Sequence, residues 1–235
     1  MKGKIGLFGL LALSWLVCSA PVRAAPMLDF WAFNIDGSVS SGLLGDSMSP
    51  VTGSLDASGL GSLSLNVSGA GSHSVLAYFD FEFSETGNSF FNEYADIVGV
   101  LAAGQSWEID DPSNGDIEAN VIAGALDNLF LGNSGVFPID VTGAPILGDP
   151  AFAIGWDFNL AINEVATIDW FLSSQDGAPG FFITQSDPAS DETMYFWSTL
   201  SIRNVPPVPT IPEPGVLLLL GTGLLGLMAA RRRTV

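Results

Sequence analysis

The sequence predicts a mainly β fold: a single antiparallel β-sandwich or jelly-roll-like domain, with an N-terminal signal helix and a C-terminal transmembrane helix outside it. Two observations carry this prediction. Residues 74–83, SVLAYFDFEF, place three phenylalanines on one side and Asp80 and Glu82 on the other, which is the period of a half-buried strand. Short runs rich in β-branched and aromatic residues also recur roughly every ten residues, separated by turn clusters.

Residues 1–24 are predicted to be a signal peptide. Two lysines precede an apolar stretch, residues 5–17, and small side chains before Ala24 and Ala25 suit signal peptidase, so cleavage is expected after one of these alanines. The only cysteine, Cys18, directly follows the apolar stretch and is removed with it. The mature protein is therefore expected to form no disulfide, and its stability must come from core burial.

Residues 26–204 are predicted to form the exported β-sandwich-like domain. The turn clusters between its apolar runs, such as residues 68–72 and 110–115, are rich in Gly, Ser, Asp, Asn and Pro. No part of this region has a sustained helical period, although residues 123–131 suit a short helix or turn. The expected strands cover residues 28–35, 60–67, 74–83, 117–122, 152–160, 165–172, 180–185 and 193–202.

The C-terminal segment divides into a linker and an apolar helix. Residues 205–214 are rich in proline and should be extended. Residues 215–235 are expected to form a transmembrane helix and a basic tail; the uncharged part, 215–230, measures about 24 Å against a hydrocarbon core of about 30 Å. A buried core helix is the alternative. The arginines at the end, which would snorkel to the interface and hold the C-terminus in the cytoplasm, are Arg231, Arg232 and Arg233.

The last 25 or so residues resemble a known bacterial sorting signal. The tripeptide Pro212-Glu213-Pro214, a short glycine-containing apolar helix and a terminal arginine cluster occur in this order, as in the PEP-CTERM signal of exported proteins. The resemblance implies processing near the tripeptide by an exosortase, a membrane peptidase, after the precursor is anchored in the inner membrane. It further implies transfer or release to the cell surface or the extracellular matrix, in hosts that make exopolysaccharide and biofilm.

The exported region is strongly acidic, and this limits its partners. Of the 25 acidic residues only Glu213 lies outside residues 26–210, and of the seven basic residues only Arg203 lies inside, so this region has a net charge of −23. Nucleic acid is excluded as a partner because phosphate contacts require Lys and Arg. Direct adhesion to anionic lipid or acidic polysaccharide is excluded as well, unless divalent cations bridge the two.

The sequence contains only weak signals of catalysis, and we expect that the protein is not an enzyme. His73 is the only histidine, so a Ser-His-Asp triad would have to use it, and no G-x-S-x-G motif accompanies it. Glycosidase chemistry requires only two carboxylates, which any acidic β-sandwich offers by chance. A polysaccharide hydrolase is therefore the least favoured function.

Two stretches are candidate calcium sites. Residues 110–118, DDPSNGDIE, resemble a calcium loop through Asp110, Asn114 and Asp116, but proline at position three and valine at position twelve depart from that pattern. The second candidate combines Asp80 and Glu82 on one strand face with Asn92 and Glu93, which a hairpin through residues 85–88 would bring beside them. The alternatives are a turn capped by Asp and Asn, and a solvated sheet face.

Carbohydrate contact is the third kind of site considered. Most tryptophans lie inside strand patterns, where burial is expected. Trp107, followed by Glu108 and Asp110 beside a loop, is the candidate for an exposed ring that contacts glycan. The sequence therefore predicts an exported, non-enzymatic surface or matrix component, with a calcium- or glycan-binding surface module as the alternative and no cofactor beyond a possible calcium ion.

Overall fold

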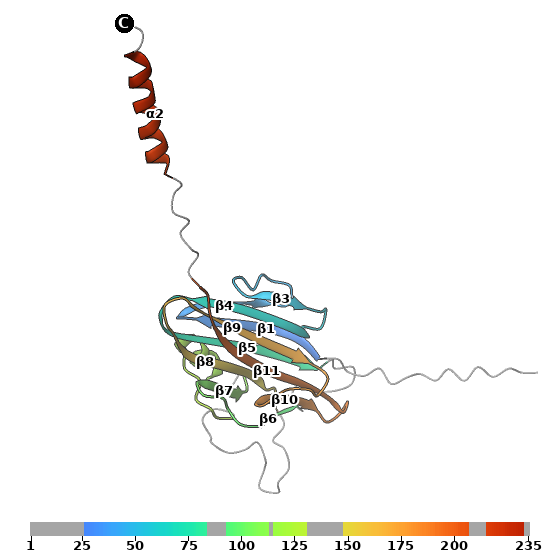
Figure 1. Ribbon diagram of the computed structural model, residues 1–235. Helices are drawn as coiled ribbons and strands as arrows, with labels where there is room; N and C mark the ends of the chain where they lie inside the picture. Colours follow the sequence, from blue (N-terminus) through green and yellow to red (C-terminus); the bar gives the residue numbers. More distant parts are fainter. Residues whose placement is uncertain (1–25, 84–92, 113–114, 131–147, 207–214, 233–235) are drawn as a thin grey trace, which may run out of the picture.

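The computed structural model describes residues 26–83, 93–112, 115–130, 148–206 and 215–232. Its domain consists of two antiparallel sheets packed face to face, and the described residues also include a C-terminal helix (Figure 1). β1 begins at Pro26 and β11 ends at Asn204. The strands are β1 (Pro26–Ile35), β2 (Ser38–Leu43), β3 (Thr52–Leu55), β4 (Gly61–Ser68), β5 (Gly71–Phe83), β6 (Tyr94–Val98), β7 (Gln105–Asp110), β8 (Ala151–Leu160), β9 (Glu164–Ser173), β10 (Phe182–Asp187) and β11 (Glu192–Asn204).

The two sheets are built mostly from neighbours that are distant in sequence. The five-stranded sheet has the order β2-β1-β5-β8-β7, and the six-stranded sheet has the order β3-β4-β9-β11-β10-β6. All of these pairings are antiparallel. The predicted antiparallel sandwich is therefore confirmed.

Alternation along the strands builds the core between the sheets. In β5, Phe79, Phe81 and Phe83 are fully buried, while Asp80 and Glu82 face outward and are half-buried. Phe79 packs edge to face against Phe196 of β11, with ring centroids 5.2 Å apart. Such contacts between the inner faces account for the stability of a domain whose described part contains no cysteine.

Residues 117–122 form a helix, and the strand predicted there is wrong. α1 (Ile117–Ala123) lies on the outer face of the five-stranded sheet. Ile117 and Val121, one helical turn apart, are buried against an apolar patch on that face. The patch comprises Ala32, Tyr78, Ala151 and Ala153. The β-branched residues indicated a strand, but their spacing of four serves equally well to bury one side of a short helix.

Four strands, β2, β3, β6 and β7, were not predicted. β2 is a polar edge strand whose hairpin with β1 turns at Asp36-Gly37, and both turn residues have positive φ, 51° and 84°. Asp-Gly is the dipeptide that such tight hairpins favour, so this signal was available in the sequence. β3 is only four residues long and almost fully exposed, which leaves no apolar pattern to recognise.

The C-terminal helix is α2 (Val216–Arg231), which includes Arg231 and is followed by Arg232. Within the described part of the chain, no helix combines the length and the apolar character that crossing a membrane requires. The predicted signal peptide, the Pro212-Glu213-Pro214 tripeptide and Arg233 lie outside the described residues.

Candidate functional site

The outer face of the five-stranded sheet gathers two groups of carboxylates. One group comprises Asp80 and Glu82 of β5 with Asp149, which lies just before β8. The other comprises Glu108 and Asp110 of β7 with Asp116, which precedes α1. Within each group, one oxygen of every residue lies within 4.8 Å of the corresponding oxygens of the other two.

In the first group, which we call the β5 acidic cluster, no carboxylate has a cationic partner among the described residues. Burial raises the pKa of Asp80 to about 7, and the charge of Asp149 adds to this effect. Burial and the charge of Asp149 also raise the pKa of Glu82, and burial raises the pKa of Asp149 itself. One oxygen of each of the three residues is shielded from solvent and has no hydrogen-bond partner.

Tyr78 lies two residues before Asp80 on the same face of β5 and is only 1% exposed. Its hydroxyl group has no hydrogen-bond partner. Burial raises its pKa, and the charges of Asp80, Glu118 and Asp149 raise it further. Two members of the β5 acidic cluster, Asp80 and Asp149, are thus among the charges that act on this buried hydroxyl group.

Glu93 does not join the β5 acidic cluster as a ligand. It is fully buried, and its two oxygens accept hydrogen bonds from the amide of Phe83, at 3.1 Å, and from the side chain of Gln185. Burial raises the pKa of Glu93 to about 7, while these two donors oppose the rise. Its backbone pairs with Gly148, which places Asp149 beside it. Asn92, which the sequence placed with Glu93, lies outside the described residues.

In the second group, the carboxylates hold α1 on the sheet. Asp110 accepts hydrogen bonds from the amides of Asp111 and Asp116, at 2.9 and 2.6 Å. Glu108 accepts bonds from the Asn120 side chain, at 2.9 Å, and from the amide of Asp127, at 3.2 Å. These partners give the buried carboxylates a structural role. Asn114 of the predicted calcium loop lies outside the described residues, and the calcium loop itself stays a prediction.

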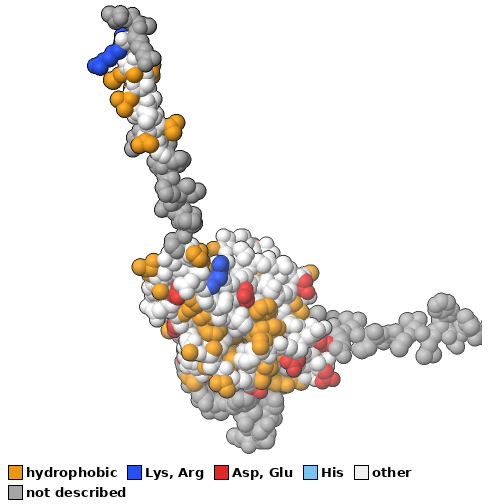
Figure 2. All heavy atoms as spheres, in the orientation of Figure 1, with side chains coloured by type: hydrophobic (Ala, Val, Ile, Leu, Met, Phe, Trp, Pro, Cys, Tyr) orange, Lys and Arg blue, Asp and Glu red, His pale blue; other side chains and the backbone are white. Residues whose placement is uncertain are grey.

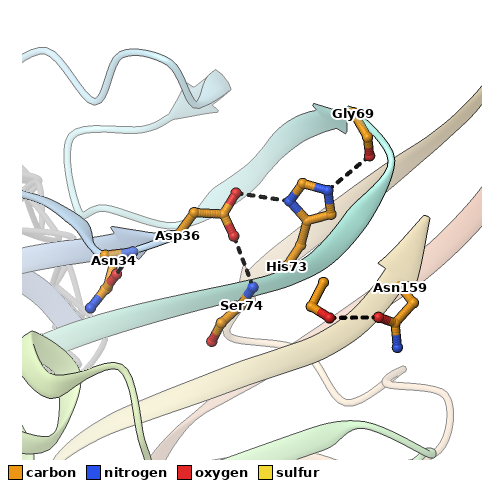
Figure 3. Close-up of polar contacts among 8 residues, drawn as sticks. Asn34, Asp36, Gly69, His73, Ser74 and Asn159 are labelled. Carbon is orange, nitrogen blue, oxygen red and sulfur yellow. Dashed lines mark hydrogen bonds and ion pairs between the residues drawn. The ribbon is translucent and has the colours of Figure 1, made fainter. Parts of the chain in front are cut away.

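His73 forms a separate polar contact at the end of the β1–β2 hairpin (Figure 3). Its Nδ1 lies 2.8 Å from Asp36 Oδ2, and its Nε2 lies 2.9 Å from the Gly69 carbonyl oxygen. Both ring nitrogens face acceptors, so the doubly protonated ring fits best, and the hydrogen bond with Asp36 raises the pKa of His73. The ring also stacks on Phe158, with centroids 5.5 Å apart.

Trp107 is only 5% exposed, which corrects the expectation of an exposed ring. It points into the core, where it packs edge to face against Phe130 with centroids 4.8 Å apart. Among the described tryptophans, the one that is partly exposed is Trp197, on the outer face of the six-stranded sheet. Its cross-strand neighbours there are Phe171 of β9, stacked at 5.0 Å, and Phe182 of β10.

These three aromatic residues and Tyr195, all half-buried, form what we call the aromatic strip. Figure 2 shows hydrophobic side chains gathered on the face of the domain that carries these strands. Val98 of β6, which is 42% exposed, pairs with Phe182 and extends the strip to a fourth strand.

Sequence reasoning identified Asp80 and Glu82 but missed Asp149, Glu108 and Tyr78. Asp149 stands in Gly148-Asp149-Pro150, which resembles an ordinary turn. Its position beside β5 results from the long-range pairing of β8 with β5, which no local pattern reveals. Glu108 alternates with Trp107 and Ile109, so a strand at residues 105–110 would have placed it opposite the core.

The C-terminal segment matches the family model of the PEP-CTERM protein-sorting motif over residues 210–233. No curated protein and no solved structure matches the chain. The matched segment runs from the end of the proline-rich linker through α2 to the arginine cluster. The chain therefore carries a PEP-CTERM protein-sorting motif at its C-terminal end, and this motif implies export and sorting by an exosortase.

Proposed function

We propose that this protein is a non-enzymatic component of the cell surface or extracellular matrix, and that its domain binds neutral polysaccharide of that matrix. The observation that carries the proposal is the aromatic strip. Its outward-facing aromatic residues lie side by side across neighbouring strands of one sheet face.

The chemistry of the strip suits carbohydrate. Phe171, Trp197, Phe182 and Val98 form a row across four strands, about 14 Å at ordinary strand spacing. Aromatic side chains offer apolar surface against which the C–H faces of sugar rings pack, and they lose little conformational entropy on binding.

The negative charge beside the aromatic strip favours a neutral glycan over an acidic one. Asp169 and Asp96 are half-buried on the strands β9 and β6 that carry the ends of the row. Their carboxylates can accept hydrogen bonds from sugar hydroxyl groups but would repel uronic acids and sulfated sugars. Only one basic residue, Arg203, lies within residues 26–210 to attract such groups.

The surroundings of His73 disfavour catalysis. A triad base needs a ring nitrogen free to accept a proton, and both nitrogens of His73 face acceptors. We therefore expect no turnover of polysaccharide.

For the sorting signal, we propose cleavage near Pro212-Glu213-Pro214 after α2 and its arginines have anchored the precursor in the inner membrane. The test is the intact mass of the protein recovered from the matrix, compared between wild type and Glu213→Ala. A wild-type mass that ends near the tripeptide, with the variant retained at full length in the membrane, supports the proposal. A full-length wild-type tail in the membrane contradicts it.

Polysaccharide binding is tested by Trp197→Ala, with the protein incubated with purified neutral and acidic fractions of the host matrix. Loss of a central aromatic contact should weaken binding to the neutral fraction by about tenfold or more. Ile162→Ala is the control, because Ile162 is 77% exposed but lies in the turn after β8. Equal binding by wild type and Trp197→Ala would exclude the strip as the contact surface.

A further inference from the structure

The β5 acidic cluster brings three carboxyl groups close together without a basic side chain of the described residues to pair with them. Asp80 Oδ1, Glu82 Oε2 and Asp149 Oδ1 are shielded from solvent and have no hydrogen-bond partner. The only basic residue within residues 26–210 is Arg203, which is exposed on β11 of the opposite sheet. Within residues 26–210, no basic side chain therefore lies on the sheet face that carries the β5 acidic cluster.

Tyr78 supplies a second and independent observation. Its side chain is 1% exposed and lies on the same face of β5 as Asp80 and Glu82, and the charges of Asp80 and Asp149 act on its hydroxyl group. Within the described part of the chain, this hydroxyl group has no hydrogen-bond partner. Buried polar groups are nearly always hydrogen-bonded, so an exception requires an explanation, and a bound ion or water molecule is one. A hydroxyl donor suits the carboxylates of the cluster or water molecules bound to an ion between them.

We propose that Asp80, Glu82 and Asp149 bind one divalent cation, calcium by preference. Two oxygens bound to the same calcium ion at about 2.4 Å lie no more than about 4.8 Å apart. The three carboxylates meet this condition, because one oxygen of each lies within 4.8 Å of the others.

The donor set selects calcium. All three side chains offer oxygen only, whereas zinc favours histidine and cysteine, and magnesium dehydrates reluctantly. The residues are half-buried, so an ion can reach them while water completes its coordination. An exported protein also meets calcium at concentrations that suit sites of millimolar to submillimolar affinity.

The cation would join two segments that are distant in sequence. Asp149 lies at the start of the chain segment that enters β8, and Asp80 and Glu82 lie near the end of β5. β5 and β8 pair directly from Gly71 to Phe79 of β5, so the ion would extend this attachment beyond the last paired residues. The site lies on the sheet opposite the aromatic strip, so the two proposals stand or fall separately.

The second carboxylate group provides a contrast. Glu108 and Asp110 are both 1% exposed, and each accepts hydrogen bonds from main-chain or side-chain donors around α1. Their charge therefore has partners, whereas the β5 acidic cluster combines equally close carboxylates with oxygens that have none.

The test uses the full-length protein in mild detergent, stripped with a chelator and returned to metal-free buffer at neutral pH. Calcium chloride alone should raise the Tm with saturation, equilibrium dialysis should show one bound calcium ion per chain, and magnesium should act more weakly. Asp149→Asn should weaken calcium binding by about tenfold or more, because one of three charged ligands is lost. The same variant should raise the Tm of the metal-free protein, because it removes repulsion from the cluster.

Asp157→Asn is the matched control. It removes one charge from β8, but Asp157 is exposed and is not a member of the cluster. This variant should keep the calcium-dependent rise in Tm. The proposal is overturned if calcium neither binds to nor stabilises the wild type, or if Asp149→Asn keeps the same calcium response as Asp157→Asn. The opposite effects expected of Asp149→Asn with and without calcium separate loss of the site from damage to the fold.

Discussion

Gln185 of β10 donates a hydrogen bond from Nε2 to the main-chain carbonyl oxygen of Phe81 in β5, across 2.7 Å, and so joins the two sheets inside the core. The same amide group donates to the carboxylate of Glu93, whose other oxygen accepts from the amide of Phe83. A fully buried acid is thus held by donors from both sheets.

Gln185→Leu should therefore destabilise the domain in a pH-dependent way. Removing the donor leaves the Phe81 carbonyl without its partner, at a cost of about 1–3 kcal/mol in the free energy of unfolding. Burial raises the pKa of Glu93 to about 7, so Glu93 is neutral at pH 5 and charged at pH 8. Because the lost bond stabilises the charged form, the destabilisation should be greater at pH 8 than at pH 5.

Urea unfolding at both pH values measures this effect. Thr184→Val, the neighbouring residue on the outer face of β10, is the control and should change stability little at either pH. A loss of equal size at pH 5 and pH 8 would show that the hydrogen bond to the Glu93 carboxylate contributes nothing.

His73 should stabilise the fold at acidic pH only. Its hydrogen bond with Asp36 raises its pKa above the ordinary value of about 6.5. When the pKa is higher in the folded state than in the unfolded state, protonation stabilises the fold. This stabilisation is complete below the unfolded-state pKa and disappears as pH rises through the folded-state pKa. His73→Gln should therefore lower the Tm at pH 5 and have little effect at pH 9.

The pKa of His73 can also be measured directly. His73 is the only histidine in the chain, so its ring protons give a single titrating NMR signal. Asp36→Asn should move that pKa downward. A wild-type pKa at or below about 6.5 would contradict the structural interpretation of the pair.

The strands were predictable where one face is apolar and the other polar. β5 shows this alternation over Phe79 to Phe83, and the sequence placed Asp80 and Glu82 correctly on the outer face. In β11 the run Tyr195-Phe196-Trp197 carries aromatic residues on both faces, so hydrophobicity alone could not decide which ring is buried. For the same reason, the sequence could not show that Trp197, rather than Trp107, is the partly exposed ring.

α1 and Asp149 could not be predicted because long-range contacts determine them. The helix has few local signals, and its attachment depends on Asn34, Glu108 and Asp110 from strands that only the folded sheet brings together. Asp149 reaches the β5 acidic cluster for the same reason. Local sequence patterns show the periodicity of the side chains in each element, but they do not show the order of the strands in a sheet.

Gly104→Ala should be strongly destabilising. Gly104 has φ of +80°, and an added Cβ would overlap the carbonyl oxygen of Asp157, where β7 begins to pair with β8. Gly37→Ala is the matched control, because Gly37 has φ of +84° with open space around the added atom.

Each alanine should cost about 1–2 kcal/mol for its positive φ. The difference between the two variants therefore isolates the steric overlap, and we expect Gly104→Ala to lose about 2 kcal/mol more in denaturant unfolding. Equal losses would mean that the β7–β8 pairing adapts freely to the added methyl group.

Asn34→Ala should loosen the attachment of α1 to the sheet, although it changes no residue of the helix. The buried side chain of Asn34 donates to the carbonyl oxygens of Val121 and Ile122, at 2.7 and 3.1 Å, and accepts from the amide of Gly37. Alanine leaves these main-chain groups without their partners, at a cost of about 2–4 kcal/mol in the free energy of unfolding.

Hydrogen exchange distinguishes release of α1 from a general loss of stability. Amides of α1 should lose protection in Asn34→Ala by a larger factor than amides of β9 and β11, which belong to the opposite sheet. Asn159→Ala is the control, because Asn159 is exposed and its side-chain oxygen accepts a hydrogen bond from the Ser72 hydroxyl group, at 2.7 Å. Uniform loss of protection across all three elements would show that Asn34 stabilises the whole sandwich rather than the attachment of α1.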